Sequence, residues 1–148
     1  MPTLIAQRIA EQLLLLKRED EALMLIEEAL KRETRPVDRL YFLFSALSNL
    51  DDPDTKLEQY SWQVQEISHF MGIVVPAEYE TFSAKIAFLR NENIKASRRY
   101  GEIMIKNRAL TKQEKIEVLK SYIEKEVIKQ YRKFAEQAIN GIQVSKKS

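Results

Sequence analysis

The sequence predicts an all-α protein. The chain holds only three glycines and four prolines in 148 residues, and 45% of its residues are hydrophobic while 31% are charged. Glycine and proline are common in the turns that connect the strands of a sheet, and this chain has few of them. The composition therefore favours long helices joined by short connections. We expect six to seven helices in one domain over residues 1–142, followed by a disordered basic tail over residues 143–148.

The first three helices are predicted at residues 4–17, 21–33 and 37–50. In the first two, apolar residues recur at spacings of three and four. The third, VDRLYFLFSALSNL, is apolar on almost every side, which is typical of a buried helix. Because fourteen residues are too few to cross a bilayer, we expect this helix to lie in the core of the domain.

A fourth helix is predicted from Pro53, after an aspartate cap, to Met71, where Gly72 stops it. Its apolar residues form a narrow seam at intervals of three and four: Leu57, Tyr60, Val64, Ile67 and Met71. Trp62 lies on the opposite side of this helix. This tryptophan is therefore either covered by a second neighbour or exposed.

Three more helices are expected in the second half of the chain. Pro76 opens the fifth, and the polar residues 91–93 separate it from the sixth. Thr111 and Glu114 match a reciprocal capping box, which opens a long last helix that ends near Gly141. The predicted inner face of this last helix consists of Ile116, Leu119, Ile123, Val127, Phe134 and Ala138.

Two stretches carry the small and aromatic residues of a helical-hairpin repeat at the required spacing. They are Ala10, Ala22, Ile26 and Ala29 within residues 4–33, and Ala84, Ala96 and Tyr100 within residues 78–108. In these positions the chain resembles tetratricopeptide repeats, although the copies do not follow the roughly 34-residue period. The resemblance implies a concave surface that binds a partner segment, with the long C-terminal helix as its cap. An orthogonal helical bundle fits the same helices.

Little in the chain points to catalysis. The absence of cysteine excludes disulfides, thiolate metal sites and cysteine nucleophiles. His69, the only histidine, forms with Glu66 half of a di-iron carboxylate motif, but the second half is missing. The three glycines are too far apart for a phosphate-binding loop. We therefore expect no enzyme activity, no cofactor and no metal.

Charge is divided unevenly along the chain. Residues 1–90 hold 10 Lys/Arg against 15 Asp/Glu, whereas residues 91–148 hold 14 against 7. Such an asymmetry bears on partners and assembly. The basic residues that could contact phosphates are Arg98, Arg99, Lys125, Lys129, Arg132 and Lys133. Acidic residues are mixed among them, which favours a solvated, salt-bridged face instead.

The candidates for a partner surface are large apolar groups. Trp62 and the leucine run with Leu14 and Leu15 lie off the main seams, and Tyr41 joins them as a further aromatic anchor. The alternative interpretation is that these side chains pack inside the monomer.

The favoured hypothesis for function is a non-catalytic interaction or adaptor module, cytoplasmic and homo-oligomeric. It binds a partner segment or itself and has no membrane span. The alternative is a helical subunit of a nucleoprotein complex that binds nucleic acid backbone through its basic C-terminal helices.

Overall fold

The structure is a computed structural model that describes residues 3–145. Over these residues it contains eight α-helices, one short 3-10 helix and no strand, which confirms the all-α prediction. Contacts divide the chain into two compact units where the sequence predicts one domain. Unit 1 comprises the described residues up to His69 together with Val74–Arg90, and unit 2 comprises Phe70–Ile73 together with the described residues from Asn91 onward. Because Phe70–Ile73 carries no charge, the division into an acidic and a basic part of the sequence is also the division between these units.

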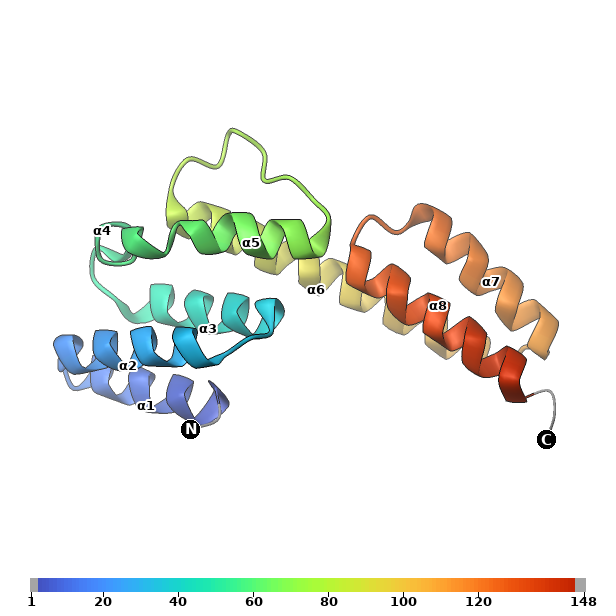
Figure 1. Cartoon of the computed structure of the whole chain (residues 1–148), viewed down its shortest axis with the longest axis horizontal. Coiled ribbons are helices and arrows are strands. Elements are labelled where there is room, and N and C mark those ends of the chain that lie inside the picture. Colours follow the sequence, from blue (N-terminus) through green and yellow to red (C-terminus); the bar gives the residue numbers. More distant parts are fainter. Residues whose placement is uncertain (1–2, 146–148) are drawn as a thin grey trace. The chain divides into compact units, whose positions relative to one another are not determined.

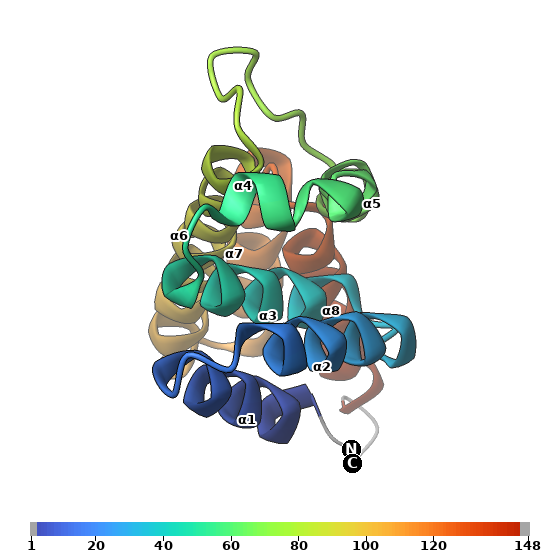
Figure 2. The same cartoon turned by 90° about the vertical axis from the view of Figure 1, so that its left-hand side faces the viewer.

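Unit 1 begins with three helices, α1 (Thr3–Leu15), α2 (Glu19–Arg32) and α3 (Pro36–Asn49). Figures 1 and 2 show them grouped together. Helix α1 contacts both α2 and α3, and its small residues Ala6 and Ala10 are buried there. Helix α3 provides much of the core of unit 1, as its composition predicts, through its buried residues Leu40, Phe42, Leu43 and Ala46.

The predicted fourth helix is broken into three pieces, α4 (Pro53–Lys56), the 3-10 helix η1 (Glu58–Tyr60) and α5 (Trp62–Met71). Asp52 precedes the first piece in left-handed geometry, with φ 46°, and its side chain makes no capping hydrogen bond. The tighter 3-10 turn places residues three apart above one another, which keeps both Leu57 and Tyr60 buried. The predicted seam is buried along its whole length, and Gly72, at φ +76°, follows the end of α5.

Helix α6 (Phe82–Asn107) is one continuous helix of 26 residues, so the two helices predicted in this region are wrong. The polar residues at 91–93 do not break it because their side chains bond away from their own backbone. Glu92 pairs with Lys95 at 3.7 Å, and the Asn93 amide oxygen accepts a hydrogen bond from Gln130 at 3.3 Å.

The start of α6 also differs from the prediction at Pro76. Residues 73–81 form a loop, and Thr81 Oγ1 accepts a hydrogen bond from the Ala84 amide at the first turn of the helix. The second stretch that resembles a tetratricopeptide repeat is therefore a loop and a single helix rather than a hairpin.

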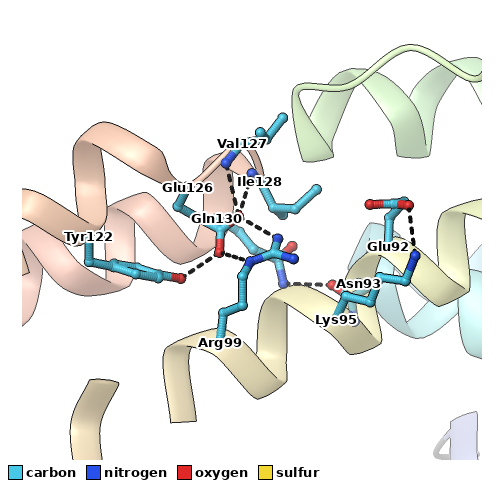
Figure 3. A network of polar contacts seen from close by, with 9 residues as sticks. All are labelled: Glu92, Asn93, Lys95, Arg99, Tyr122, Glu126, Val127, Ile128 and Gln130. Atoms are coloured by element: carbon cyan, nitrogen blue, oxygen red, sulfur yellow. Dashed lines mark hydrogen bonds and ion pairs between the residues drawn. The ribbon is translucent and has the colours of Figure 1, made fainter. Parts of the chain in front are cut away.

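The long last helix is likewise two helices, α7 (Lys112–Lys125) and α8 (Lys129–Val144). Between them the buried carboxylate of Glu126 accepts hydrogen bonds from the amides of Val127 and Ile128, at 2.9 and 3.2 Å (Figure 3). The chain turns there, so the inner face predicted for a single helix is wrong at Val127 and Phe134, although Ala138 packs against the core as predicted. Val127 and Phe134 are exposed, whereas the buried residues of α8 are Ala135 and Ile139.

Helix α8 continues past Gly141, so the predicted stop there is wrong. Gln143 and Val144, assigned to the tail by sequence, are its last residues. Ser145 follows as the C-cap of α8, and residues 146–148 of the predicted tail lie outside the described residues.

The capping box at the start of α7 is present as predicted. Thr111 Oγ1 accepts a hydrogen bond from the Glu114 amide at 3.2 Å, and the Glu114 carboxylate accepts one from the Thr111 amide at the same distance. Replacing Thr111 by alanine is expected to lower the free energy of unfolding by about 1 kcal/mol, because the Glu114 amide loses its acceptor. Urea unfolding followed by circular dichroism measures this loss. Thr111→Ser keeps the hydroxyl and should retain most of the stability, so equal losses in both variants would contradict a role for the cap.

Candidate functional site

Unit 1 contains a cleft of about 610 Å³. It is bounded by α2, by the connection from α2 to α3, and by α3, η1 and α5. The residues that line it are Glu27, Leu30, Lys31, Glu33, Thr34, Arg39, Gln59, Tyr60, Trp62 and Glu66. A volume of this size falls in the range of natural ligand pockets. The cleft is therefore the first candidate for a functional site.

Arg39 is the unusual residue of this cleft. It stands on the core helix α3, and only 6% of its surface is exposed. One guanidinium nitrogen donates to Glu66 Oε1 at 2.8 Å, while Nε has no hydrogen-bond partner among the described residues. Buried donors in proteins are nearly always paired, because an unpaired one costs about 1–3 kcal/mol. A cationic group with unused bonding capacity is thus held in the wall of the cleft.

Two aromatic residues complete the wall, Tyr60 at the end of η1 and Trp62 at the start of α5. Trp62 remains 52% exposed, so of the two possibilities left open by sequence, exposure is the one observed. Tyr60 is buried, and this burial, followed by the nearby charge of Glu27, raises the pKa of its hydroxyl. Tyr60 is therefore a neutral hydrogen-bonding group at physiological pH. The cleft thus combines an exposed indole with a buried arginine in its lining.

The carboxylates around the cleft already have partners within unit 1. Glu27 pairs with Lys31 at 3.5 Å, and Glu33 pairs with Arg35 at 3.2 Å. Glu66 forms an ion pair with the guanidinium of Arg39. These carboxylates line the cleft together with the apolar surfaces of Leu30, Tyr60 and Trp62.

The other predicted partner residues do not line this cleft. Tyr41 lies near the guanidinium of Arg90, which is 5.9 Å from the centre of its ring. Leu14 is half-buried and lines a small hollow with Ile26, Phe42 and Ala46, whereas Leu15 is 69% exposed. Of the four residues, Trp62 alone lines the cleft, and the partner-binding role of all four stays a prediction.

Sequence reasoning missed Arg39 and Tyr60. A signal for Arg39 was present, since it is a cation that directly precedes the apolar run Leu40–Phe44 on a helix predicted to be buried. A charged residue is almost never fully buried unless it is paired. Its pairing with Glu66, 27 residues away, depends on the tertiary structure.

The six basic residues predicted to contact nucleic acid differ in their exposure and in their ion pairs. Arg98, Lys125, Lys129 and Lys133 are exposed. Arg99 pairs with the buried Glu126 at 2.7 Å, and the Nε of Arg132 is buried. At least one of the six therefore makes an internal ion pair, as the salt-bridged reading expects, and contact with nucleic acid stays a prediction.

Glu126 is the centre of a polar network in unit 2 (Figure 3). Its carboxylate accepts from Arg99 at 2.7 and 3.1 Å, from the Tyr122 hydroxyl at 2.8 Å and from two backbone amides. Burial acts to raise the pKa of Glu126, but the hydrogen bonds from Arg99, the Ile128 amide and Tyr122 outweigh burial and lower this pKa. Burial and the bond to Glu126 raise the pKa of the Tyr122 hydroxyl. The network fixes both side chains as well as the turn between α7 and α8.

The half-motif of Glu66 and His69 is not part of a metal cluster in the structure. Glu66 instead forms the ion pair with Arg39. Among the described residues, no group of three or more His, Asp or Glu side chains could hold a metal ion. No helix within residues 3–145 is both long and apolar enough to cross a membrane.

Comparison with protein families, with curated proteins and with solved structures finds no match to this chain in any of the three. The fold and the cleft are thus the observations that bear on function.

Proposed function

We propose that this protein is a non-catalytic interaction module that binds a segment of a partner protein in the cleft of unit 1. The observation that carries this proposal is the half-exposed Trp62 at a cleft of about 610 Å³ whose wall contains the buried Arg39. Tryptophan and arginine are the residues most enriched among those that dominate binding energy. Both occur here in one cleft.

The proportions of the cleft suit a short peptide segment. Leu30, Tyr60 and Trp62 offer apolar surface to one or two large side chains. Arg39 and Thr34 offer donors for the carbonyl groups of a bound backbone. A segment that buries an apolar anchor and pairs its own polar groups gains affinity without any chemical step. His69, the only histidine of the chain, is not among the residues that line this cleft.

Peptides selected from a displayed random library against the purified protein provide the probe. Trp62 is the only tryptophan, so its fluorescence reports directly on the cleft. We expect selected peptides to shift the emission of Trp62 to shorter wavelength, because binding removes the indole from water. In calorimetric titrations, Trp62→Ala should weaken binding by at least about tenfold, the loss expected for an aromatic anchor.

Met24→Ala is the matched control, since Met24 is a large exposed apolar residue of unit 1 outside the cleft. This variant should bind the selected peptides as the original protein does. Equal binding by Trp62→Ala would contradict the proposal, and so would an equal loss in both variants. Failure of the library to yield any peptide that shifts the emission would also count against it.

A further inference from the structure

Unit 2 contains a hollow of its own, of about 320 Å³, between α6 and α7. Helix α6 contributes Arg99, Glu102, Ile103 and Lys106. These residues are spaced by three, one and three positions, so they form a single strip along one face of the helix. A strip of about two turns lines one side of the hollow.

Helix α7 contributes a second strip with the same spacing, formed by Val118, Ser121, Tyr122 and Lys125. Two such strips from neighbouring helices form the walls of a groove. The small Ser121 leaves room at its centre, while Val118 and Tyr122 make that wall apolar. This geometry is the one by which helical proteins receive a further helix along its apolar face.

Charge in this groove is of one dominant sign. The lining holds three cations, Arg99, Lys106 and Lys125, and one carboxylate, Glu102. Arg99 is already paired with Glu126, so the two lysines provide the excess positive charge. The apolar groups Ile103, Val118 and Tyr122 lie in the same lining. An occupant must therefore present apolar side chains on one face and carboxylates beside them.

Two of the groove residues are held in place before anything binds. The carboxylate of Glu126 fixes the guanidinium of Arg99 and the hydroxyl of Tyr122, each through hydrogen bonds of 3.1 Å or less (Figure 3). The side chain of Arg99 is still about half exposed, at 46%, so it can meet a second carboxylate. Groups ordered in advance lose less entropy on binding, which strengthens association.

We propose that this groove binds an acidic amphipathic helix of a partner protein. The apolar face of that helix contacts Ile103, Val118 and Tyr122, and its carboxylates pair with Lys106, Lys125 and Arg99. Charge complementarity selects the acidic sequence and speeds the encounter, because unit 2 as a whole carries an excess of basic residues. This site lies in a different unit from the Trp62 cleft, so the protein has two separate docking sites.

A labelled peptide of about four helical turns is the probe, with leucine at spacings of three and four and glutamate on its remaining faces. Fluorescence anisotropy measures its binding to the full chain. Lys106→Glu combined with Lys125→Glu should weaken binding by at least about tenfold. Ser121→Trp, which fills the centre of the groove without changing its charge, should do the same. A matched peptide with lysine in place of glutamate should not bind.

Lys120→Glu is the control for charge, since Lys120 is exposed on α7 but does not line the groove. It should change the affinity by less than about threefold, an effect of screened long-range charge alone. Trp62→Ala should leave the affinity unchanged, which separates this proposal from that for unit 1.

Three outcomes would overturn the proposal. They are the absence of saturable binding of the acidic peptide, equal losses in Lys120→Glu and the double variant, and full affinity in Ser121→Trp. Displacement of the peptide by a single-stranded oligonucleotide at equal concentration would overturn it in favour of a nucleic acid surface.

Discussion

Replacing Glu126 by glutamine is expected to lower the free energy of unfolding by about 3 kcal/mol. The carboxylate accepts five hydrogen bonds, from Arg99, Tyr122 and the amides of Val127 and Ile128. A glutamine presents an NH₂ group to some of these donors, and it leaves the guanidinium of Arg99 without its counter-charge. Because the Glu126 side chain is fully buried, water cannot replace the lost acceptor. Urea unfolding followed by circular dichroism measures the effect.

Glu124→Gln is the matched control for this change. Glu124 is exposed on the same helix, two residues earlier, and the same chemical replacement there should change stability by less than about 0.5 kcal/mol. Similar losses in the two variants would show that the network around Glu126 does not stabilise unit 2.

The same carboxylate should make stability depend on pH. Because the pKa of Glu126 is lower in the folded than in the unfolded chain, its ionised form stabilises the fold. This contribution is fully present above the unfolded-state pKa, near the ordinary value of 4.5, and is lost as pH falls toward the lower folded-state pKa. The stability difference between the original protein and Glu126→Gln should therefore shrink as pH falls below about 4.5. A difference that stays constant over this range would contradict the assignment.

Leu43→Ala is expected to lower the free energy of unfolding by about 3 kcal/mol. Leu43 lies on the core helix α3 and has no exposed surface. Its truncation removes buried methyl groups and leaves a cavity that close-packed neighbours fill only in part. Urea denaturation monitored by the fluorescence of Trp62 reports this loss, since Trp62 belongs to the same unit as Leu43.

The control for Leu43 is Leu16→Ala, the same replacement at a leucine that is 65% exposed. Little apolar surface is returned to water there, so its effect should remain within about 0.5 kcal/mol. If the two substitutions cost the same, the core of unit 1 would not be centred on α3.

Local sequence signals predicted well those features that depend on neighbouring residues. The capping box of Thr111 and Glu114, the stop at Gly72 and the first three helices follow from side chains within a few positions. The buried seam from Leu57 to Met71 was also predicted, because burial follows the periodicity of apolar residues. The same periodicity placed Trp62 on the side of the helix opposite the seam, which made it a candidate for partner binding.

Two of the errors occur where a polar side chain bonds to a distant residue. Asn93 was expected to break a helix, but Gln130, 37 positions later, donates to its side chain and the helix continues. Glu126 was expected inside a helix, but Arg99, 27 positions earlier, holds it at a turn. Neither partner could be identified from residues nearby in the chain.

The sequence by itself determined the helical class and most of the core, since these depend on composition and on spacing along one helix, whereas the exposure of Trp62 was decided by the tertiary structure. The tertiary structure decided where helices end and which charged groups are buried. It also brought Arg39 and Glu66 together beside Trp62, and Arg99 beside Tyr122. The physical reason is that desolvating a charge is favourable only when its partner is in place, and the partner is set by the packing of separate helices.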